Sequence, residues 1–255
     1  MTNLELLAHY IDCDAYGFNR IAVITGAGIS TDSGIPDFRS KRGLYNTFCS
    51  ALRFNSTVFR WLPWAFYHKI GPLYTTIKTA KPNAAHKALA ALAKLPGKRL
   101  DIITQNVDGL HQAAGSKHVH EIHGTLKTLT CQRCGKHVRM SKNIAAAVES
   151  GSVPRHSCGG VLKPDIVFFG DTCPDKAYND ALTAVEKADM IIICGTSLRV
   201  GTVLALLENR KPNALVVVMN NEETALDNIA SMRIKGNLSK MLGWLSREVT
   251  KQYRT

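Results

Sequence analysis

The sequence lacks any hydrophobic run near the ~20 residues that are needed to span a lipid bilayer. Its first ten residues contain no basic stretch followed by an apolar one, so we expect no secretory signal and a cytoplasmic location. Internal repeats and low-complexity segments are also absent. With 255 residues, of which 45% are hydrophobic, the chain can bury a substantial core. We therefore expect one α/β unit with a small insert.

Acidic residues are missing from the segment 38–100, which holds twelve of the 32 lysine and arginine residues. The rest of the chain has 20 basic and 20 acidic residues, so the net charge of +12 arises in this segment. We interpret it as a solvated basic face. The alternative is a surface that attracts polyanions such as nucleic acid. Its aromatic residues are spaced like the core face of a helix rather than like a base-stacking platform.

The apolar segments of the chain alternate with helical ones. The strand candidates are 21–24, 100–104, 119–122, 190–194 and 215–219. The helix candidates are 4–16, 84–93, 174–188 and 203–207. This alternation predicts a doubly wound, parallel, Rossmann-like sheet with helices on both faces. Two segments, 41–80 and 126–163, interrupt the pattern.

The turn Gly26-Ala27-Gly28 follows the first strand candidate but lacks the third glycine of the usual dinucleotide-binding fingerprint. In such a turn the glycines let the backbone approach a pyrophosphate, which then sits on the N-terminus of the next helix. An ordinary strand-to-helix turn would look the same. Asp37-Phe38-Arg39 follows within a dozen residues and adds a charge pair and an aromatic ring beside the turn.

Polar residues follow two further strand candidates. Asn106 and Asp108 stand two residues apart after 100–104, so an extended chain places their side chains on one side and Gln105 on the other. An amide can orient a ribose or a water, and a carboxylate can hold a hydroxyl group, although both residue types are also common in turns. Gly195-Thr196-Ser197 follows 190–194, where small and hydroxyl-bearing residues suit a phosphate or ribose contact.

Taken together, these motifs resemble the sirtuins, which are NAD-dependent protein-lysine deacylases. The matching stretches, in family order, are 26–45, 82–86, 104–111, 121–125, 164–170, 195–198 and Asn220. The resemblance covers nearly the whole chain and implies NAD as a cosubstrate. The residues that it assigns to NAD are Gly26, Ala27, Gly28, Ile29, Asp37, Phe38, Arg39, Tyr45, Gln105, Asn106, Val107, Asp108, Gly195, Thr196, Ser197, Asn220, Asn221 and Glu222.

The resemblance also implies a division into two lobes. The large, NAD-binding lobe would comprise approximately 1–40, 81–125 and 164–255. The insertions 41–80 and 126–163 would form a smaller helical and zinc-binding lobe.

His123, within Glu121-Ile-His-Gly-Thr125, is the expected catalytic base because a neutral imidazole can accept a proton at physiological pH. In the sirtuins the acyl oxygen attacks the nicotinamide ribose, and the histidine then activates a ribose hydroxyl. The products are nicotinamide, the deacylated lysine and O-acyl-ADP-ribose. Asn106 and Asp108 are expected to assist.

Two other functions remain open at this stage. The same scaffold could serve a protein ADP-ribosyltransferase or an NAD hydrolase. A non-enzymatic alternative is a zinc-containing nucleic-acid-binding module built on 38–100. The presence of His123 together with Asn106 and Asp108 favours the deacylase, because binding alone would not need this set.

The substrate side of the resemblance rests on Val167-Phe168-Phe169-Gly170, which is similar to the strand that pairs with the acyl-lysine peptide. Asp171 stands where the family more often has glutamate. The sirtuins that remove acidic acyl groups hold the carboxylate with a tyrosine and an arginine three residues apart. The nearest match here is Tyr67 with Ile70, so we expect neutral acyl groups to be preferred, although Lys69 could substitute for the arginine.

The cysteines suggest a metal site that departs from the usual pattern. In an intracellular chain, cysteines are more often free thiols or metal ligands than disulfides. Cys131-Gln-Arg-Cys134 has zinc-knuckle spacing, but the second pair is reduced to Cys158. His156 would complete a Cys3His set. Three cysteines with an outside ligand, or a lost site, are the alternatives, and His137 and Cys173 are weaker fourth ligands. The zinc would be structural.

Overall fold

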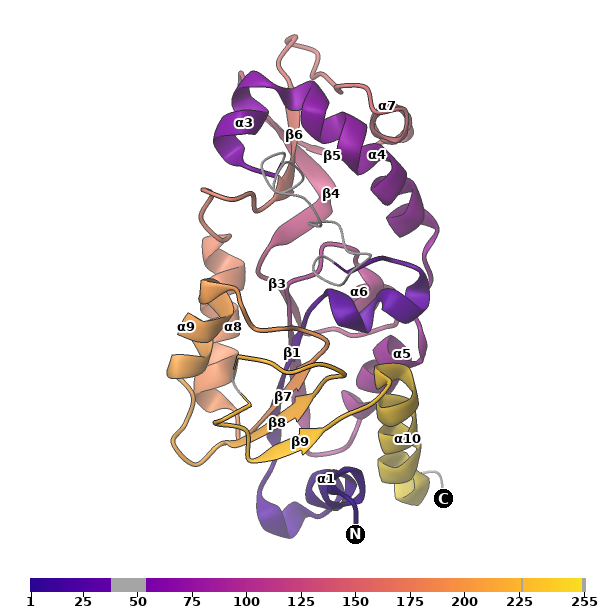
Figure 1. Ribbon diagram of the computed structural model, residues 1–255, viewed down its shortest axis with the longest axis vertical. Helices are drawn as coiled ribbons and strands as arrows, with labels where there is room; N and C mark the ends of the chain where they lie inside the picture. The colour runs from indigo at the N-terminus through magenta and orange to yellow at the C-terminus, as the bar shows by residue number, and fades with distance from the viewer. Residues whose placement is uncertain (38–53, 226, 254–255) are drawn as a thin grey trace.

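Six parallel strands form the large sheet, in the order β3-β2-β1-β7-β8-β9 (Figure 1). The structure is a computed structural model and describes residues 1–37, 54–225 and 227–253. The strands are β1 (Arg20–Thr25), β2 (Arg99–Thr104), β3 (Val119–Glu121), β7 (Met190–Cys194), β8 (Leu215–Met219) and β9 (Met232–Ile234). Strands β1 to β3 are added in one direction across the sheet and β7 to β9 in the other. The boundary between β1 and β7 is therefore the switch point of a doubly wound fold. The predicted fold class is confirmed.

Helices cover both faces of this sheet (Figure 1). One layer contains α1 (Asn3–Asp12), α5 (Ala84–Leu92) and α10 (Leu238–Thr250), and the other contains α8 (Asp175–Lys187) and α9 (Gly201–Glu208). Successive strand residues point to opposite faces. Ile192 therefore joins the core under the first layer, and Ile191 joins the core under the second; both are fully buried. None of the helices in the described ranges is long and apolar enough to cross a membrane.

The predicted helix over 4–16 is shorter in the structure. Helix α1 ends at Asp12 because Cys13 is extended, and a separate 3-10 turn covers Asp14–Tyr16. The helix begins at a capping box, in which Thr2 accepts a hydrogen bond from the amide of Glu5 and the Glu5 carboxylate accepts one from the amide of Thr2. The other three predicted helices lie within one or two residues of α5, α8 and α9.

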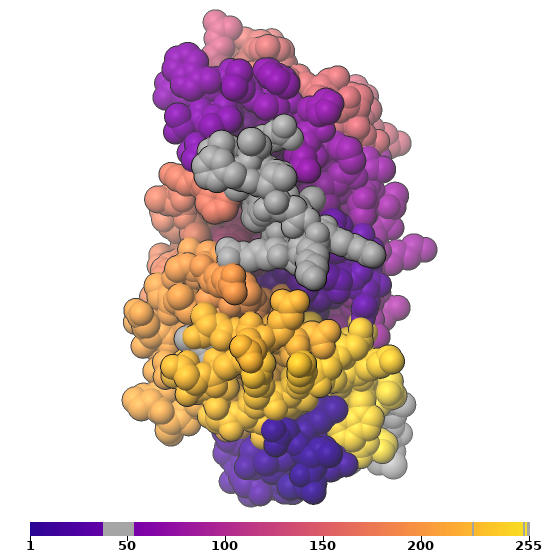
Figure 2. Space-filling model, in the orientation of Figure 1, coloured from indigo at the N-terminus to yellow at the C-terminus, as the bar shows by residue number. Residues whose placement is uncertain are grey.

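The remaining elements form a small lobe, which we define as residues 54–79 and 124–171 (upper part of Figure 1). Its antiparallel sheet has the order β5-β4-β6. The elements are α3 (Ser56–Trp61), α4 (Pro63–Thr79), β4 (Gly124–Cys131), β5 (His137–Arg139), α7 (Lys142–Glu149) and β6 (Leu162–Ile166), with a short helix α6 (Leu110–Ala113) below them. In the space-filling view, purple and pink residues of the small lobe are at the top and the indigo N-terminal residues form the base (Figure 2).

An aromatic cluster fills the interior of the small lobe. Phe59, Phe66 and Phe168 are each at most 2% exposed, and their ring centroids lie 4.9–5.5 Å apart. The lobe joins the large sheet through a very short connection. Strand β3 ends at Glu121 and β4 begins at Gly124, so only Ile122 and His123 separate the two sheets.

Candidate functional site

The carboxyl ends of β1 and β7 meet at the switch point through glycines. The amide of Gly28 donates to the carbonyl of Gly195 at 2.9 Å, and the amide of Gly26 donates to the carbonyl of Cys194 at 3.2 Å. A Cβ on Gly28 would lie 2.8 Å from the Gly195 oxygen, so this approach requires glycine. Ala27 is half-buried at the same turn. The backbone of these glycines therefore lies close to the crevice at the carboxyl ends of the strands, where such sheets bind nucleotides.

The helix that was expected to follow this turn is replaced by two short 3-10 turns, Ala27–Ile29 and Thr31–Ser33. Gly34 then adopts a left-handed conformation, with φ 85°, and ends the second turn. The element that follows the glycine turn is therefore a short 3-10 turn and not the α-helix of the usual dinucleotide-binding unit. Ile29 is 1% exposed and packs in the core under α1, α5 and α10.

Polar side chains gather along the same edge of the sheet. Gln105 follows β2, and its Nε2 donates to Thr196 Oγ1, after β7, at 2.9 Å. Asn220 follows β8 and donates through Nδ2 to the carbonyl of Glu222 at 3.0 Å. Ser197 is half-buried, whereas Asn221 and Glu222 are exposed. The structure thus brings the predicted residues after β1, β2, β7 and β8 to one edge.

Ser30 connects the two residues that were predicted to assist catalysis. The Nδ2 atom of Asn106 donates to Ser30 Oγ and to the carbonyl of Gly26, both at 3.1 Å. Ser30 Oγ donates to Asp108 Oδ2 at 2.7 Å. The other carboxylate oxygen of Asp108 accepts the amide of Leu110 at 2.9 Å. Because both Nδ2 hydrogens of Asn106 are used, its Oδ1 atom is left to accept a hydroxyl or a water.

Two buried histidines support this cluster from below. His86 Nε2 lies 3.5 Å from Ser30 Oγ, and His111 Nε2 lies 3.0 Å from Thr25 Oγ1. Their rings meet edge to face, with centroids 4.8 Å apart. Burial lowers the pKa of His86, and burial together with the nearby His86 lowers the pKa of His111 to about 3. Both rings are therefore neutral at physiological pH.

His123 occupies the connection between the two sheets. Its Nδ1 lies 3.1 Å from the carbonyl oxygen of Gln105, which can only accept, so Nδ1 carries the proton and Nε2 has the free lone pair. Burial lowers the pKa of His123, and the bond to Gln105 opposes this shift. Gly124 follows with φ 77°, and a Cβ there would lie 2.0 Å from the Asp165 carbonyl oxygen. The neutral ring can therefore act as a proton acceptor.

The four predicted metal ligands come together at the end of β4 in the small lobe. Their donor atoms, from Cys131, Cys134, His156 and Cys158, all lie within 4.8 Å of one another. The Sγ of Cys158 is 3.5 Å from the other two sulfurs and 3.2 Å from His156 Nδ1. A tetrahedral zinc with sulfur ligands at about 2.3 Å would place them about 3.8 Å apart, so this Cys3His set fits zinc.

The other candidate ligands lie outside this cluster. His137 bonds to Thr130 at 2.9 Å, and Cys173 contacts Thr202. A Cβ on Gly160 would lie 2.5 Å from the Cys131 sulfur, so the close-packed cluster depends on a glycine that sequence reasoning did not single out.

Comparison with known proteins shows the family of this chain. The family model described as "Sir2 family" matches residues 26–202. The chain belongs to the Sir2 family. A Cutibacterium acnes protein named NAD-dependent protein deacetylase is 37% identical over 250 residues, which are 96% of this chain and 98% of that protein.

Solved structures agree with the sequence match. One described as "Structural Basis for the Mechanism and Regulation of Sir2 Enzymes" has a TM-score of 0.86 at 30% identity and covers 98% of both chains. A second, described as a Sir2 homolog–NAD complex, has a TM-score of 0.83 at 32% identity and covers 97% of this chain and 94% of that one. The Sir2 family therefore accounts for the fold of both lobes.

The expected peptide-binding strand of this Sir2-family chain is not a strand. Strand β6 ends at Ile166, and the chain then turns at Gly170, which has φ 93°. Only an isolated bridge joins Phe169 to Asn55. Phe168 is 2% exposed in the aromatic cluster, whereas Phe169 is 50% exposed. The apolar run predicted a strand, but burial of Phe168 and the glycine turn end it; Val167 is half-buried.

The structure describes only some of the remaining residues that the resemblance assigns to NAD. Phe38, Arg39 and Tyr45 lie outside the described residues, and Asp37 is half-buried. Val107 packs against the aromatic cluster of the small lobe. Ser30, His86 and His111 also belong to this site, although their residue types alone do not indicate a role; all three lie within the stretches that resemble the sirtuins. Their location within these stretches is the one feature of the sequence that could have indicated them.

Proposed function

We propose that this chain is an NAD-dependent protein-lysine deacylase that acts chiefly on acetyl-lysine and releases nicotinamide and O-acyl-ADP-ribose. The observation that carries the proposal is the state of His123. Its tautomer is set by the Gln105 carbonyl, so Nε2 is a free proton acceptor next to the nucleotide-binding edge. The curated name of the Cutibacterium acnes relative, NAD-dependent protein deacetylase, supports the same reaction.

Three polar residues near this edge have a role in that reaction. Nε2 of His123 accepts the proton of a ribose hydroxyl, and burial keeps the ring neutral until it does so. The free Oδ1 of Asn106 accepts a hydrogen bond from a ribose hydroxyl or from a bound water. Ser30 holds Asn106 and Asp108 in place, since its hydroxyl contacts both side chains.

The decisive experiment follows the fate of an acetyl-lysine peptide by mass spectrometry, with and without NAD. The proposal expects loss of the acetyl group only with NAD, together with O-acetyl-ADP-ribose and nicotinamide. His123→Ala is the matched control. An ADP-ribosylated peptide would instead indicate a transferase, and NAD cleavage with an unchanged peptide would indicate a hydrolase. Either result would contradict the proposal.

The basic segment 38–100 does not enter this proposal. Part of its charge is used within the fold, because Lys78 pairs with Glu149, Lys98 with Asp14, and Arg99 with Asp101. The side chain of Lys98 is also almost fully buried, with 1% of its surface exposed. A contact with nucleic acid would show itself as a steep dependence of affinity on salt.

A further inference from the structure

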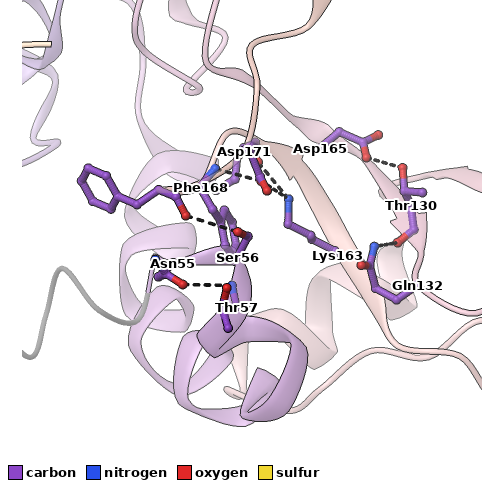
Figure 3. A network of polar contacts seen from close by, with 11 residues as sticks. Asn55, Ser56, Thr57, Thr130, Gln132, Lys163, Asp165, Phe168 and Asp171 are labelled. Atoms are coloured by element: carbon purple, nitrogen blue, oxygen red, sulfur yellow. Dashed lines mark hydrogen bonds and ion pairs between the residues drawn. The ribbon is translucent and has the colours of Figure 1, made fainter. Parts of the chain in front are cut away.

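The turn that follows β6 is closed by reciprocal hydrogen bonds between its two ends (Figure 3). The amide of Asp171 donates to the carbonyl of Phe168 at 3.0 Å. The amide of Phe168 donates in return to Oδ2 of Asp171 at 3.1 Å. Both backbone groups of Phe168 are thereby occupied by a single residue. The turn has a fixed shape that one side chain controls.

Lys163 holds the carboxylate of Asp171 in this position. Its Nζ donates to Asp171 Oδ2 at 2.8 Å and to the carbonyl of Ile166 at 3.3 Å. The same ammonium lies 4.2 Å from the ring centroid of Phe168, within the range of a cation–π contact. The Lys163 side chain is 16% exposed and that of Asp171 is 26% exposed, so solvent screens this pair less than a surface pair.

Most of the other backbone amides and carbonyls of this turn are hydrogen-bonded to neighbouring segments. The amide of Val167 donates to the carbonyl of His123 at 2.9 Å. The amide of Phe169 donates to Phe54 at 2.8 Å, and its carbonyl accepts the amide of Ser56 at 3.0 Å. Among the residues that the structure describes, the backbone groups of 167–170 left without a partner are the carbonyl of Val167 and both groups of Gly170.

We propose that Asp171, held by Lys163, is a positioning residue for the acyl-lysine peptide. By occupying both backbone groups of Phe168, it confines main-chain pairing with the peptide to Val167 and Gly170. The amide of Val167 donates to the carbonyl of His123, so the turn is joined to the backbone next to the proposed base. The inference rests on the proposed deacylase function and concerns how its substrate is held.

The test compares steady-state kinetics of Asp171→Ala, Lys163→Met and Lys163→Arg on an acetyl-lysine peptide. In Asp171→Ala we expect the KM for peptide to rise about tenfold, as for the loss of a hydrogen bond to a charged group. The kcat and the KM for NAD should change less than about twofold, because uniform binding is what is lost. Lys163→Met should show a smaller rise of the same kind, and Lys163→Arg should restore the wild-type KM.

The matched control is Lys176→Met, which removes a lysine from an exposed pair with Asp180 on α8 and should leave all three constants unchanged. Zinc content and thermal melting show whether each variant is folded. If Asp171→Ala does not fold, the difference between Lys163→Met and Lys163→Arg decides. An unchanged peptide KM in a folded variant, or a fall in kcat alone, overturns the inference. A wild-type protein that does not deacetylate the peptide overturns the proposed function instead.

Discussion

The two sheets of this protein are stabilised by different means. The central strands of the parallel sheet are buried on both faces, and Ile191, Ile192 and Ile193 have no exposed surface. The antiparallel sheet has a small apolar cluster of its own, formed by Leu129, Leu162 and the candidate metal ligand Cys131. The large sheet is therefore stabilised by hydrophobic burial, whereas the small one depends on its aromatic neighbours and on a metal.

Because of this difference, we expect that one lobe can unfold while the other stays folded, although the proposed active site needs both. His123 lies in the two-residue connection between the sheets, and its ring is held by Gln105 from the large lobe. The turn at 167–171, where we propose that the peptide pairs, belongs to the small lobe as defined above. A change that loosens only the small sheet should therefore spare nucleotide binding and impair the protein substrate.

The largest effect is expected from removing the metal. Chelation, or Cys131→Ser, should unfold the region 124–166 while the parallel sheet persists, since structural zinc contributes on the order of 10 kcal/mol in small modules. Hydrogen exchange of backbone amides measures both sheets in one experiment. Rapid exchange in β4 with continued protection in β7 is the expected result; protection of both after chelation would show that the small sheet does not need zinc.

A control in the large sheet sharpens this test. Ile192→Ala should lower the free energy of unfolding by about 2–5 kcal/mol, the usual cost of such a cavity. Zinc content should stay the same, because Ile192 is far from the metal ligands in the chain and in the fold. The two variants therefore separate the two sources of stability.

The next effect concerns the connection itself. His123→Ala should lower deacylation by about 10²–10⁴-fold, the usual loss when a general base is removed. Both sheets and the zinc content should remain, since the ring makes a single hydrogen bond to the backbone of Gln105. Peptide turnover and NAD affinity are the measurements. Activity close to that of the wild type would assign the proton transfer to another group.

A smaller effect is expected from the acyl group of the substrate. Tyr67, the candidate for a carboxylate clamp, is fully buried, and its hydroxyl donates to the carbonyl of Leu162 inside the small lobe. Ile70 is also buried there. Without a guanidinium, a buried succinyl carboxylate would lose several kcal/mol on desolvation. The kcat/KM for acetyl peptide should exceed that for succinyl peptide at least about tenfold; equal values would locate an acid-binding group elsewhere.

The smallest effect is a shift in pH dependence. Burial lowers the pKa of His123 below 6.5, so the active, neutral form persists to lower pH than for a free histidine. The acid limb of kcat/KM should thus lie below pH 6.5 and be absent in His123→Ala. The neutral ring contributes its full stability above its unfolded pKa and loses it as pH falls through the folded pKa. An acid limb above pH 7 would contradict this.

Sequence patterns predicted the large sheet better than the small one for a physical reason. β7 and β8 are central strands, and their continuous five-residue apolar runs match the predicted ranges to the residue. β4 mixes threonine, leucine and lysine, and it pairs antiparallel with β5 and, through an irregular register, with β6. β9 is three residues long with an arginine in the middle, which gives too short a pattern to detect.

The candidate site shows the same limit. His123 and the glycine turns follow from motifs that are local in sequence. The roles of Ser30 and His111 arise from contacts with His86 and Thr25, which are 56 and 86 residues away in the chain. The run Val167–Phe169 predicted a strand because it is apolar, but Phe168 packs with aromatic side chains from α3 and α4. Such contacts appear only once the chain is folded.

The contact between the turns at Gly28 and Gly195 limits how this sequence can change over time. A side chain at Gly195 would lie 2.5 Å from the Ile29 nitrogen, so the obstacle is backbone and no second substitution nearby can relieve it. The two turns must therefore keep their glycines together, whatever happens to the surrounding residues. The shape of this edge is therefore set by contacts between backbone atoms of the chain itself.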